Sequence, residues 1–215
     1  MASIVDTRLA ELLCSRICHD MVNPVGAINN GIELIEELGA SVIDEATELI
    51  GSSARKVTGH LKFYRMAYGF AGSRSIQSFR EVRDLVQGIL EDGTKRLAWP
   101  DAALPPAPPA PGWGKLLLNL VALATEGLPG GGTLGVAVSS TPTAHRFEVA
   151  ARGDKAGLTE ELTAALDPEI AVERLTARTV QAYFSAVLAA RLGARIDVAS
   201  SPNRFQITAA PIDGA

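Results

Sequence analysis

The sequence has little cysteine, no excess of positive charge and no long apolar run, and each shortage excludes a class of protein. Two of its 215 residues are cysteines. Cys14 and Cys18 lie four apart on one expected helix face, so they cannot form a disulfide framework and are interpreted as packing residues. A formal net charge of -4 argues against binding to a nucleic acid backbone. No run approaches the ~20 apolar residues of a membrane span, and Asp6, Arg8 and Glu11 argue against a signal peptide. We therefore expect a cytoplasmic protein with no nucleic acid or membrane partner.

Two long stretches of helical periodicity occupy residues 1–72, which we predict to be one domain. Asp6 and Thr7 are suitable N-cap residues for the first helix, and Gly39 is a suitable stop. The second helix begins at about Ser41 and ends at a break rich in glycine and serine. Because the connection is short, the two helices must run antiparallel.

The expected hairpin has more apolar surface than its two helices can bury by pairing once. Each helix is about 45 Å long at 1.5 Å per residue, and each carries a narrow apolar seam. We predict a homodimer that forms a four-helix bundle through residues near Ile17, Ile28, Leu49 and Leu61. The alternative is that the second half of the same chain covers the seam.

Residues 76–213 alternate between helical and strand patterns and are predicted to form a second domain. Helices are expected at 79–93, 113–128, 159–166 and 172–193, and strands at 95–100, 133–140, 145–152, 194–201 and 204–211. The proline-rich segment 101–112 predicts an extended surface loop. Helices that alternate with antiparallel strand pairs favour an α+β fold, here a two-layer sandwich.

The stretch CHDMVNP, residues 18–24, places a histidine directly before an aspartate within the first helix. His19 lies ~200° around the helix from the apolar seam, so it should be exposed. A solvated surface histidine without a role is one interpretation. A metal site is rejected, because Cys18 points ~100° away from His19 and because His60 and His145 lie in unrelated contexts.

The third interpretation is a nucleophile for phosphoryl transfer. A neutral imidazole is an effective nucleophile near neutral pH, because the ordinary pKa of histidine is about 6.5. Phosphoryl transfer needs mainly positioning and charge stabilisation, and an exposed histidine on a rigid helix is accessible to a partner protein. Asp20 would orient the imidazole of His19, and Asn23 would position a water or a phosphoryl oxygen. Gly26 leaves room for close approach, and Pro24 would bend the helix at the site.

His19-Asp20, followed by Asn23-Pro24, resembles the H-box of the dimerisation and histidine-phosphotransfer domain of sensor histidine kinases. The longer stretch LLCSRICHDMVNPVGAINNGIELIEE, together with KFYRMAYGF in the second helix, looks more like the ChpT-type histidine phosphotransferases. The resemblance spans essentially the whole chain. It implies a dimeric four-helix bundle with a degenerate kinase-type ATPase domain attached to each protomer.

The resemblance also implies a role as an intermediate of a phosphorelay in a bacterial two-component system. His19 would accept a phosphoryl group from the receiver domain of a hybrid histidine kinase and pass it to response-regulator receiver domains. The family implies no cofactor for this chain, since the Mg²⁺ belongs to the receiver partners. Arg16, Asn23, Gly26 and Asn30, which share the helix stripe of His19, are expected to contact these partners.

The second half departs from a true kinase at the positions that would bind a nucleotide. Asn119 matches the first asparagine of the kinase N-box, but Leu123 replaces the second. Ala151 replaces the carboxylate that receives the adenine, although the neighbouring Asp154 makes that alignment ambiguous. Thr179-Val180-Gln181 replaces the glycines of the lid, so no phosphate cradle is evident. We expect ATP-independent phosphotransfer, with an ATP-dependent histidine kinase and a non-catalytic interaction module as the alternatives.

Overall fold

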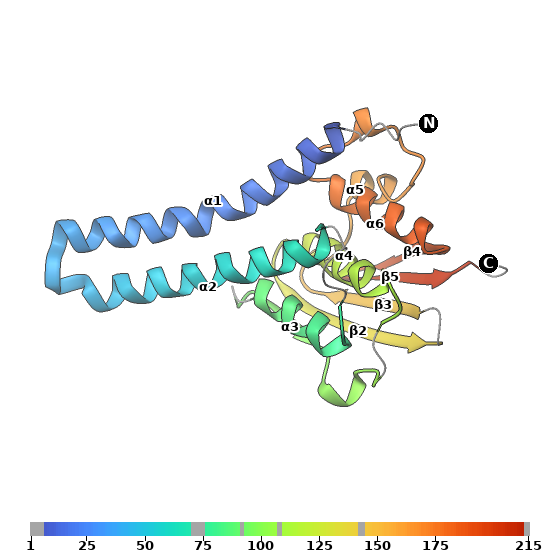
Figure 1. The fold of residues 1–215 in the computed structure, drawn as a ribbon, viewed down its shortest axis with the longest axis horizontal. Helices are drawn as coiled ribbons and strands as arrows, with labels where there is room; N and C mark the ends of the chain where they lie inside the picture. Colours follow the sequence, from blue (N-terminus) through green and yellow to red (C-terminus); the bar gives the residue numbers. More distant parts are fainter. Residues whose placement is uncertain (1–6, 70–75, 91–92, 107–108, 142–144, 213–215) are drawn as a thin grey trace.

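The computed structural model describes residues 7–69, 76–90, 93–106, 109–141 and 145–212. The chain begins with an antiparallel hairpin of helices α1 (Thr7–Leu38) and α2 (Ile43–Ala67), joined by the 3-10 turn η1 (Gly39–Val42). The hairpin projects from an α/β body as a long arm (Figure 1). Gly39 has a φ of 63°, a left-handed conformation that suits glycine, and it ends α1 as predicted. The predicted break after α2 falls on residues 70–75, outside the described residues.

Helix α1 changes direction along its length (Figure 1), and Pro24 lies inside it. Proline lacks the N–H that would bond the carbonyl four residues earlier, here that of Asp20, and its ring crowds that carbonyl. A proline is the ordinary cause of such a bend. We therefore attribute the change of direction to Pro24, about one turn after the His19–Asp20 pair.

The second half forms a five-stranded sheet with helices packed on one face (Figure 1). The strands are β1 (Lys95–Ala98), β2 (Gly132–Ser140), β3 (His145–Arg152), β4 (Ala194–Ser201) and β5 (Arg204–Pro211), in the spatial order β1-β2-β3-β5-β4. The helices are α3 (Phe79–Ile89), α4 (Trp113–Glu126), α5 (Glu160–Ala164) and α6 (Val180–Arg191), with 3-10 turns η2 (Asp101–Ala103) and η3 (Val172–Arg174). Strands β1 and β2 are parallel, and the other neighbouring pairs are antiparallel. The predicted α+β fold with two layers is confirmed.

Polar side chains determine where two of these helices begin. Ser78 Oγ accepts a hydrogen bond from the Glu81 N–H at 3.1 Å, and Glu81 in turn accepts from the Gln77 N–H. The first bond satisfies a backbone donor that the first turn of α3 leaves open, and the second satisfies the N–H of the residue before the N-cap. Thr159 caps α5 in the same way, by accepting from the Leu162 N–H.

The helix predicted at residues 172–193 is shorter than expected, because α6 begins only at Val180. Thr176 and Thr179 bond to each other before it: each hydroxyl accepts the other residue's backbone N–H, at 2.9 and 3.2 Å. Such local bonds offer the backbone an alternative to the helix. The prediction of one continuous helix was therefore wrong.

A contact from the far end of the chain also fixes this segment. Arg8 of α1 donates hydrogen bonds to the carbonyls of Val172, Glu173 and Leu175, at 3.1 to 3.3 Å. Those carbonyls accept from a side chain more than 160 residues away, and the carbonyl of Val172 also accepts from the Leu175 N–H of the 3-10 turn η3. The start of α1 is thereby attached to the body.

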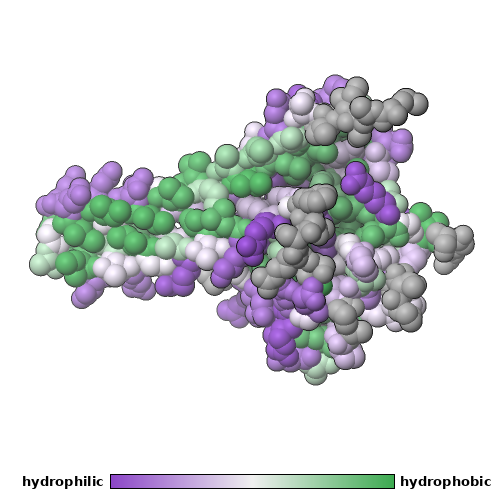
Figure 2. All heavy atoms as spheres, in the orientation of Figure 1, coloured by the Kyte–Doolittle hydropathy of each residue, from purple (hydrophilic) through white to green (hydrophobic). Residues whose placement is uncertain are grey.

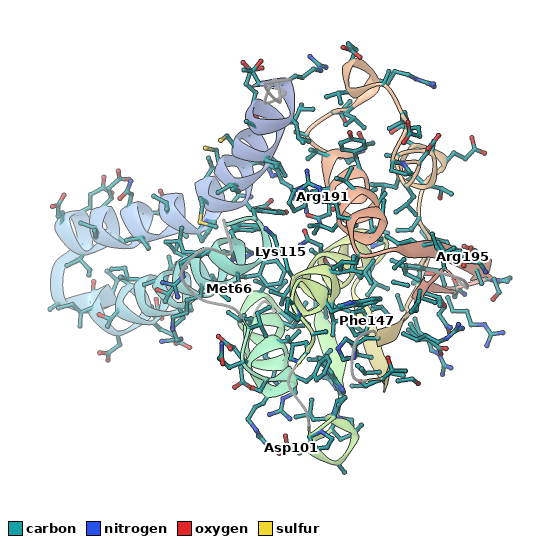
Figure 3. All side chains as sticks on the ribbon, turned by 45° about the vertical axis from the view of Figure 1, so that its right-hand side comes forward. Met66, Asp101, Lys115, Phe147, Arg191 and Arg195 are labelled. Carbon is teal, nitrogen blue, oxygen red and sulfur yellow. The ribbon has the colours of Figure 1, made fainter. Side chains whose placement is uncertain are left out.

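The base of the hairpin is built into the core of the body. Phe63, Tyr64 and Ala67 of α2 belong to the same buried apolar cluster as the inner faces of α3, α4 and the sheet. Lys115 of α4, labelled in Figure 3, donates to the carbonyl of Gly69 at 2.9 Å. The two predicted domains therefore share one core, and residues 73–75 between them lie outside the described residues.

The proline-rich segment 101–112 is anchored at both ends. Asp101, labelled in Figure 3, accepts from Arg80 at 3.2 Å and also from Arg83. Near the other end, Pro109 is buried. The prediction of a surface loop therefore holds for the exposed residues of this segment. It is wrong for Pro109, which packs close to Gly114.

His145 links the end of this segment to the sheet. It is buried, its Nε2 accepts from the Ala110 N–H at 2.9 Å, and its Nδ1 contacts Ser140 Oγ at 2.8 Å. The Nε2 acceptor role requires the neutral ring with its proton on Nδ1. Burial lowers the pKa of His145, since the charged ring would be desolvated and would lose the bond from Ala110. His145 is therefore a structural residue.

We expect His145 to make the protein less stable in mild acid. Because the pKa of His145 is lower in the folded state than in the unfolded state, the unfolded chain binds the proton more readily. The stability that neutral His145 contributes is therefore complete above the unfolded pKa and is lost as the pH falls through the folded pKa. The free energy of unfolding in urea, measured between about pH 7.5 and pH 5, should fall with acidification for the native protein. In His145→Gln this part of the slope should be missing, and identical slopes would contradict the assignment.

Candidate functional site

His19 lies on α1 with 81% of its side chain exposed, so the predicted exposure is confirmed. Its Nδ1 is 3.3 Å from Asp20 Oδ1, and within the described part of the chain its Nε2 has no hydrogen bond. An ionised carboxylate only accepts hydrogen bonds, so this contact requires the proton on Nδ1. The lone pair of Nε2 is then left facing solvent, where a phosphoryl group can approach it.

Asp20 is shared between His19 and a second residue, Tyr64 of α2. The Tyr64 hydroxyl donates a hydrogen bond to Asp20 Oδ2, while Oδ1 faces the imidazole. Burial raises the pKa of Tyr64, and the hydrogen bond to Asp20 raises it further. The hydroxyl therefore stays protonated at neutral pH and acts as a donor to the carboxylate.

Arg16, one turn before His19, is directed into the molecule. Its Nη2 lies 2.9 Å from Glu126 Oε1 at the end of α4, and 14% of its side chain is exposed. Burial lowers the pKa of Arg16, but the charge of Glu126, with smaller effects of tyrosine and aspartate neighbours, outweighs burial and raises it overall. The guanidinium is thus a permanent cation that connects the site helix to α4. The sequence predicted Arg16 on an exposed stripe, whereas most of its side chain is buried. Its contact with a partner stays a prediction.

Asn23, Gly26 and Asn30 continue along α1 from His19. The side chains of Asn23 and Asn30 are exposed, and a Cβ placed on Gly26 would have no neighbour within 4 Å. These three positions are therefore accessible from outside, as the proposed contact with a partner requires. Their roles stay predictions.

A cavity of about 700 Å³ lies beside the site, between the hairpin and the ends of α3 and α4. Its polar lining includes Asp20 and Asn23 of α1, Lys56 and His60 of α2, and Glu126 of α4. His19 does not line it. The two residues that follow His19 in the motif therefore face a polar recess that both halves of the chain build.

The positions that resemble nucleotide ligands are filled by packing and internal hydrogen bonds. Asn119 is fully buried; its Nδ2 donates to the carbonyl of Ala67 at 3.0 Å, and its Oδ1 accepts from Gln181 at 2.9 Å. Gln181 is fully buried as well and accepts from the Tyr68 hydroxyl. Burial raises the pKa of Tyr68 to about 12, so this hydroxyl is also a donor at neutral pH. These bonds connect α2, α4 and α6.

Tyr64, Glu126 and Gln181 were not assigned a role in the site from the sequence. One signal was present: His60, Tyr64 and Tyr68 recur every four residues, which places three rings with polar atoms on one face of α2. In the structure Tyr64 and Tyr68 stack with their ring centroids 5.3 Å apart. Glu126 carried no comparable signal, because its partner is distant in the sequence.

Cys14 and Cys18 are free and exposed, so their interpretation as packing residues was wrong. Among the described residues, no three His, Cys, Asp or Glu side chains are grouped so as to hold a metal ion. Within the same residues, none of the helices has the length and apolar character needed to cross a bilayer.

Comparison with known proteins identifies related chains along the whole sequence. A family model described as the histidine phosphotransferase C-terminal domain matches residues 79–204. The protein phosphotransferase ChpT of Brucella abortus (strain 2308) is 36% identical over 195 residues, which cover 88% of this chain and 89% of that protein. A solved structure of a bacterial phosphotransferase aligns with a TM-score of 0.78 at 29% identity and covers 97% of this chain and 98% of its own. The matches include both the hairpin and the sheet.

Proposed function

The chain belongs to the histidine phosphotransferase family and is a phosphotransferase, and on this premise we propose that His19 accepts a phosphoryl group from one receiver domain and passes it to another. The observation that carries the proposal is the state of the His19 ring. It is exposed on an ordered helix, Asp20 holds its Nδ1, and its Nε2 is open to solvent. The donor is the receiver of a hybrid histidine kinase, and the acceptors are response-regulator receivers.

In the proposed step, the lone pair of His19 Nε2 attacks the phosphorus of an aspartyl phosphate on the donor receiver. The N–P bond forms as the P–O bond to the aspartate breaks, and the electron pair of that bond leaves on the receiver carboxylate. The ring becomes an imidazolium whose Nδ1 proton still faces Asp20, and the carboxylate stabilises the new charge. In the onward transfer the N–P electron pair returns to Nε2 and the acceptor aspartate forms the new P–O bond.

The other predicted residues support this step by contact with the partner. Asn23 is placed to hold a phosphoryl oxygen or a water, and open space at Gly26 admits the receiver surface close to α1. No residue of this chain is assigned to Mg²⁺, which we place on the receiver. We also propose a cytoplasmic location, as expected from the sequence.

Phosphotransfer from a purified receiver tests the proposal. The receiver of a hybrid kinase is radiolabelled on its aspartate, separated from kinase and ATP, and mixed with the protein. We expect label that is acid-labile and stable to alkali on this chain, and its loss when an unlabelled response-regulator receiver is added. Labelling that requires ATP would favour a histidine kinase, and no labelling by any hybrid-kinase receiver would favour a non-catalytic interaction module.

We also propose that the working form is a homodimer joined through the hairpins. Apart from Ile212, the large apolar side chains that are exposed among the described residues lie on the arm, at Val22, Val25, Ile32, Leu34, Leu38, Ile43, Leu49 and Leu61. Figure 2 shows an apolar band along the arm. The body covers only the base of the arm (Figure 1), so the alternative that it covers the whole seam is disfavoured. Ile17 packs against the core that the base of the arm shares with the body, so it is a less suitable contact than predicted.

Charged substitutions on the arm should separate the proposed dimer. Ile32→Asp combined with Leu49→Asp would place carboxylates in the buried centre of a four-helix bundle, which costs several kcal/mol. Light scattering at micromolar concentration should give the mass of two chains for the native protein and of one chain for the variant. Ile212→Asp, at an equally exposed apolar residue outside the arm, should stay dimeric. A native protein with the mass of one chain would contradict the proposal.

A further inference from the structure

The contact between His19 and Asp20 is not one that a helix makes by itself. Neighbouring residues point ~100° apart around the helix axis, and side chains at i and i+1 do not face each other. Asp20 nevertheless has Oδ1 3.3 Å from His19 Nδ1, with 27% of its side chain exposed. A solvated aspartate has several rotamers, so something outside the dipeptide must select this one.

We propose that Tyr64 is a positioning residue for phosphoryl transfer: its hydroxyl anchors Asp20, and the anchored carboxylate holds the His19 imidazole with Nε2 unprotonated. The inference rests on the proposed function of His19 and adds a residue 44 positions from Asp20 that acts through this carboxylate. Because the Tyr64 hydroxyl binds Oδ2, it restricts the Asp20 carboxylate to orientations that keep Oδ1 near His19 Nδ1.

Other groups near Asp20 do not take over this role. Arg16 is close enough for its charge to be felt, but its guanidinium is paired with Glu126 at 2.9 Å. His60 lines the same cavity, and its Nδ1 contacts the carbonyl of Lys56 at 2.9 Å. Among the hydrogen bonds of the described residues, Asp20 receives its side-chain bonds from His19 and Tyr64.

Tyr64 is itself fixed by its aromatic neighbours. It is buried, its ring stacks on Tyr68 with an interplanar angle of 10°, and Phe63 meets it edge-on at 5.8 Å between centroids. Burial raises the pKa of its hydroxyl, so it remains a donor throughout the neutral range. The rigid core at the base of the arm therefore determines the direction in which Asp20, and through it His19, is held.

The consequence for the reaction is the choice of nucleophilic nitrogen. Free histidine exchanges between two neutral tautomers, and only the form with its proton on Nδ1 has a lone pair on Nε2. Without Tyr64, Asp20 would leave the ring for part of the time, and the reactive tautomer would be less populated. The imidazolium formed during transfer would also lose part of the stabilisation that Asp20 gives it.

Tyr64→Phe tests the inference, because it keeps the buried ring and removes only the hydroxyl. We expect transfer at saturating phosphorylated receiver to slow by about tenfold, the factor that one hydrogen bond of ordinary strength represents, with little change in the half-saturating receiver concentration. The ¹⁵N chemical shifts of the His19 ring, measured at mildly alkaline pH without any receiver, should move from one dominant tautomer toward a mixture. In an Asp20→Ala background the same change should have no further effect.

Tyr68→Phe is the matched control. It removes a hydroxyl one turn further along α2 that donates to Gln181 rather than to Asp20, so the His19 ring shifts should stay as in the native protein. Unchanged shifts and rate in Tyr64→Phe would overturn the inference while leaving the proposed function intact. If Tyr64→Phe also slowed transfer in the Asp20→Ala background, the inference would again be overturned, because Tyr64 would then act on the general structure and not through Asp20. If native His19 accepted no phosphoryl group, the proposed function would fail, yet the ring shifts would still report whether Tyr64 orients the imidazole.

Discussion

Replacing His19 with alanine should reduce phosphoryl acceptance to background while the chain remains folded. The imidazole supplies the only nucleophile proposed for the step, and the neighbouring carboxylate of Asp20 would yield no acid-labile phosphoramidate. Because the side chain is largely exposed, its removal should change the free energy of unfolding by no more than about 0.5 kcal/mol. Radiolabel on the chain after incubation with a phosphorylated receiver, alongside urea unfolding, measures both effects.

The two other histidines provide matched controls for this result. His60→Ala should keep full acceptance, because His60 lines the cavity with its Nδ1 directed at its own helix. His145→Ala should also be labelled but should be less stable, since it would leave the Ala110 N–H without its acceptor. Acid-labile label that persists in His19→Ala would show that another residue is the acceptor. Asp20→Ala and Asn23→Ala should slow transfer without eliminating it, since their proposed roles are orientation and positioning.

Mg·ATP should not bind to the body, even at millimolar concentration. A kinase site needs a carboxylate for the adenine, a second polar ligand for Mg²⁺ and a flexible glycine-rich lid for the phosphates. The aligned positions hold Ala151, Leu123 and Thr179-Val180-Gln181, and all of these residues are buried. Insertion of a nucleotide would require opening a packed core.

The energetic cost of such an opening would consume much of the free energy that nucleotide binding could supply. Gln181 would have to release Asn119 and Tyr68, and each buried polar group left without a partner costs about 1–3 kcal/mol. Micromolar affinity corresponds to about 8 kcal/mol in total. Leu123→Asn should not restore binding, because it would place an unsatisfied amide in the core instead of creating a site.

Calorimetry and labelling together test this expectation. Titration with Mg·ATP should show no saturable heat, and radiolabelled ATP alone should leave His19 unmodified. The same protein sample should accept label from a phosphorylated receiver, which establishes that it is active. Saturable micromolar binding, or label from ATP alone, would replace the proposed phosphotransferase mechanism with that of a kinase.

The residues aligned with nucleotide ligands have an observable structural role. Asn119 and Gln181 connect α4 and α6 to each other, and their bonds to Ala67 and Tyr68 connect both helices to the hairpin. Arg8 and Arg16 add contacts from α1 to the segment before α6 and to the end of α4. The body is therefore attached to the arm at several points, and it supports the helix that presents His19.

The sequence by itself determined most local elements and the exposure of the candidate histidine. Helical periodicity with a stop at Gly39 predicted the hairpin, and alternating apolar residues predicted the strands, because both patterns depend on neighbours a few residues apart. The exposure of His19 followed from its angle to the apolar seam of the same helix. In each case the deciding interaction repeats within one element, so the chain order alone contains it.

Only the tertiary structure decided which side chains hold that histidine. Tyr64 lies 44 residues from Asp20, and Tyr68 lies 113 residues from Gln181, separations at which no local pattern indicates a contact. Arg16 was expected on an exposed stripe, yet α4 supplies Glu126 on the side that it faces. The helix expected from residue 172 starts at Val180, where Arg8 holds the carbonyls before it. These outcomes depend on how the arm docks on the body, and docking is set by the shape and burial of the whole core rather than by the periodicity of any one segment.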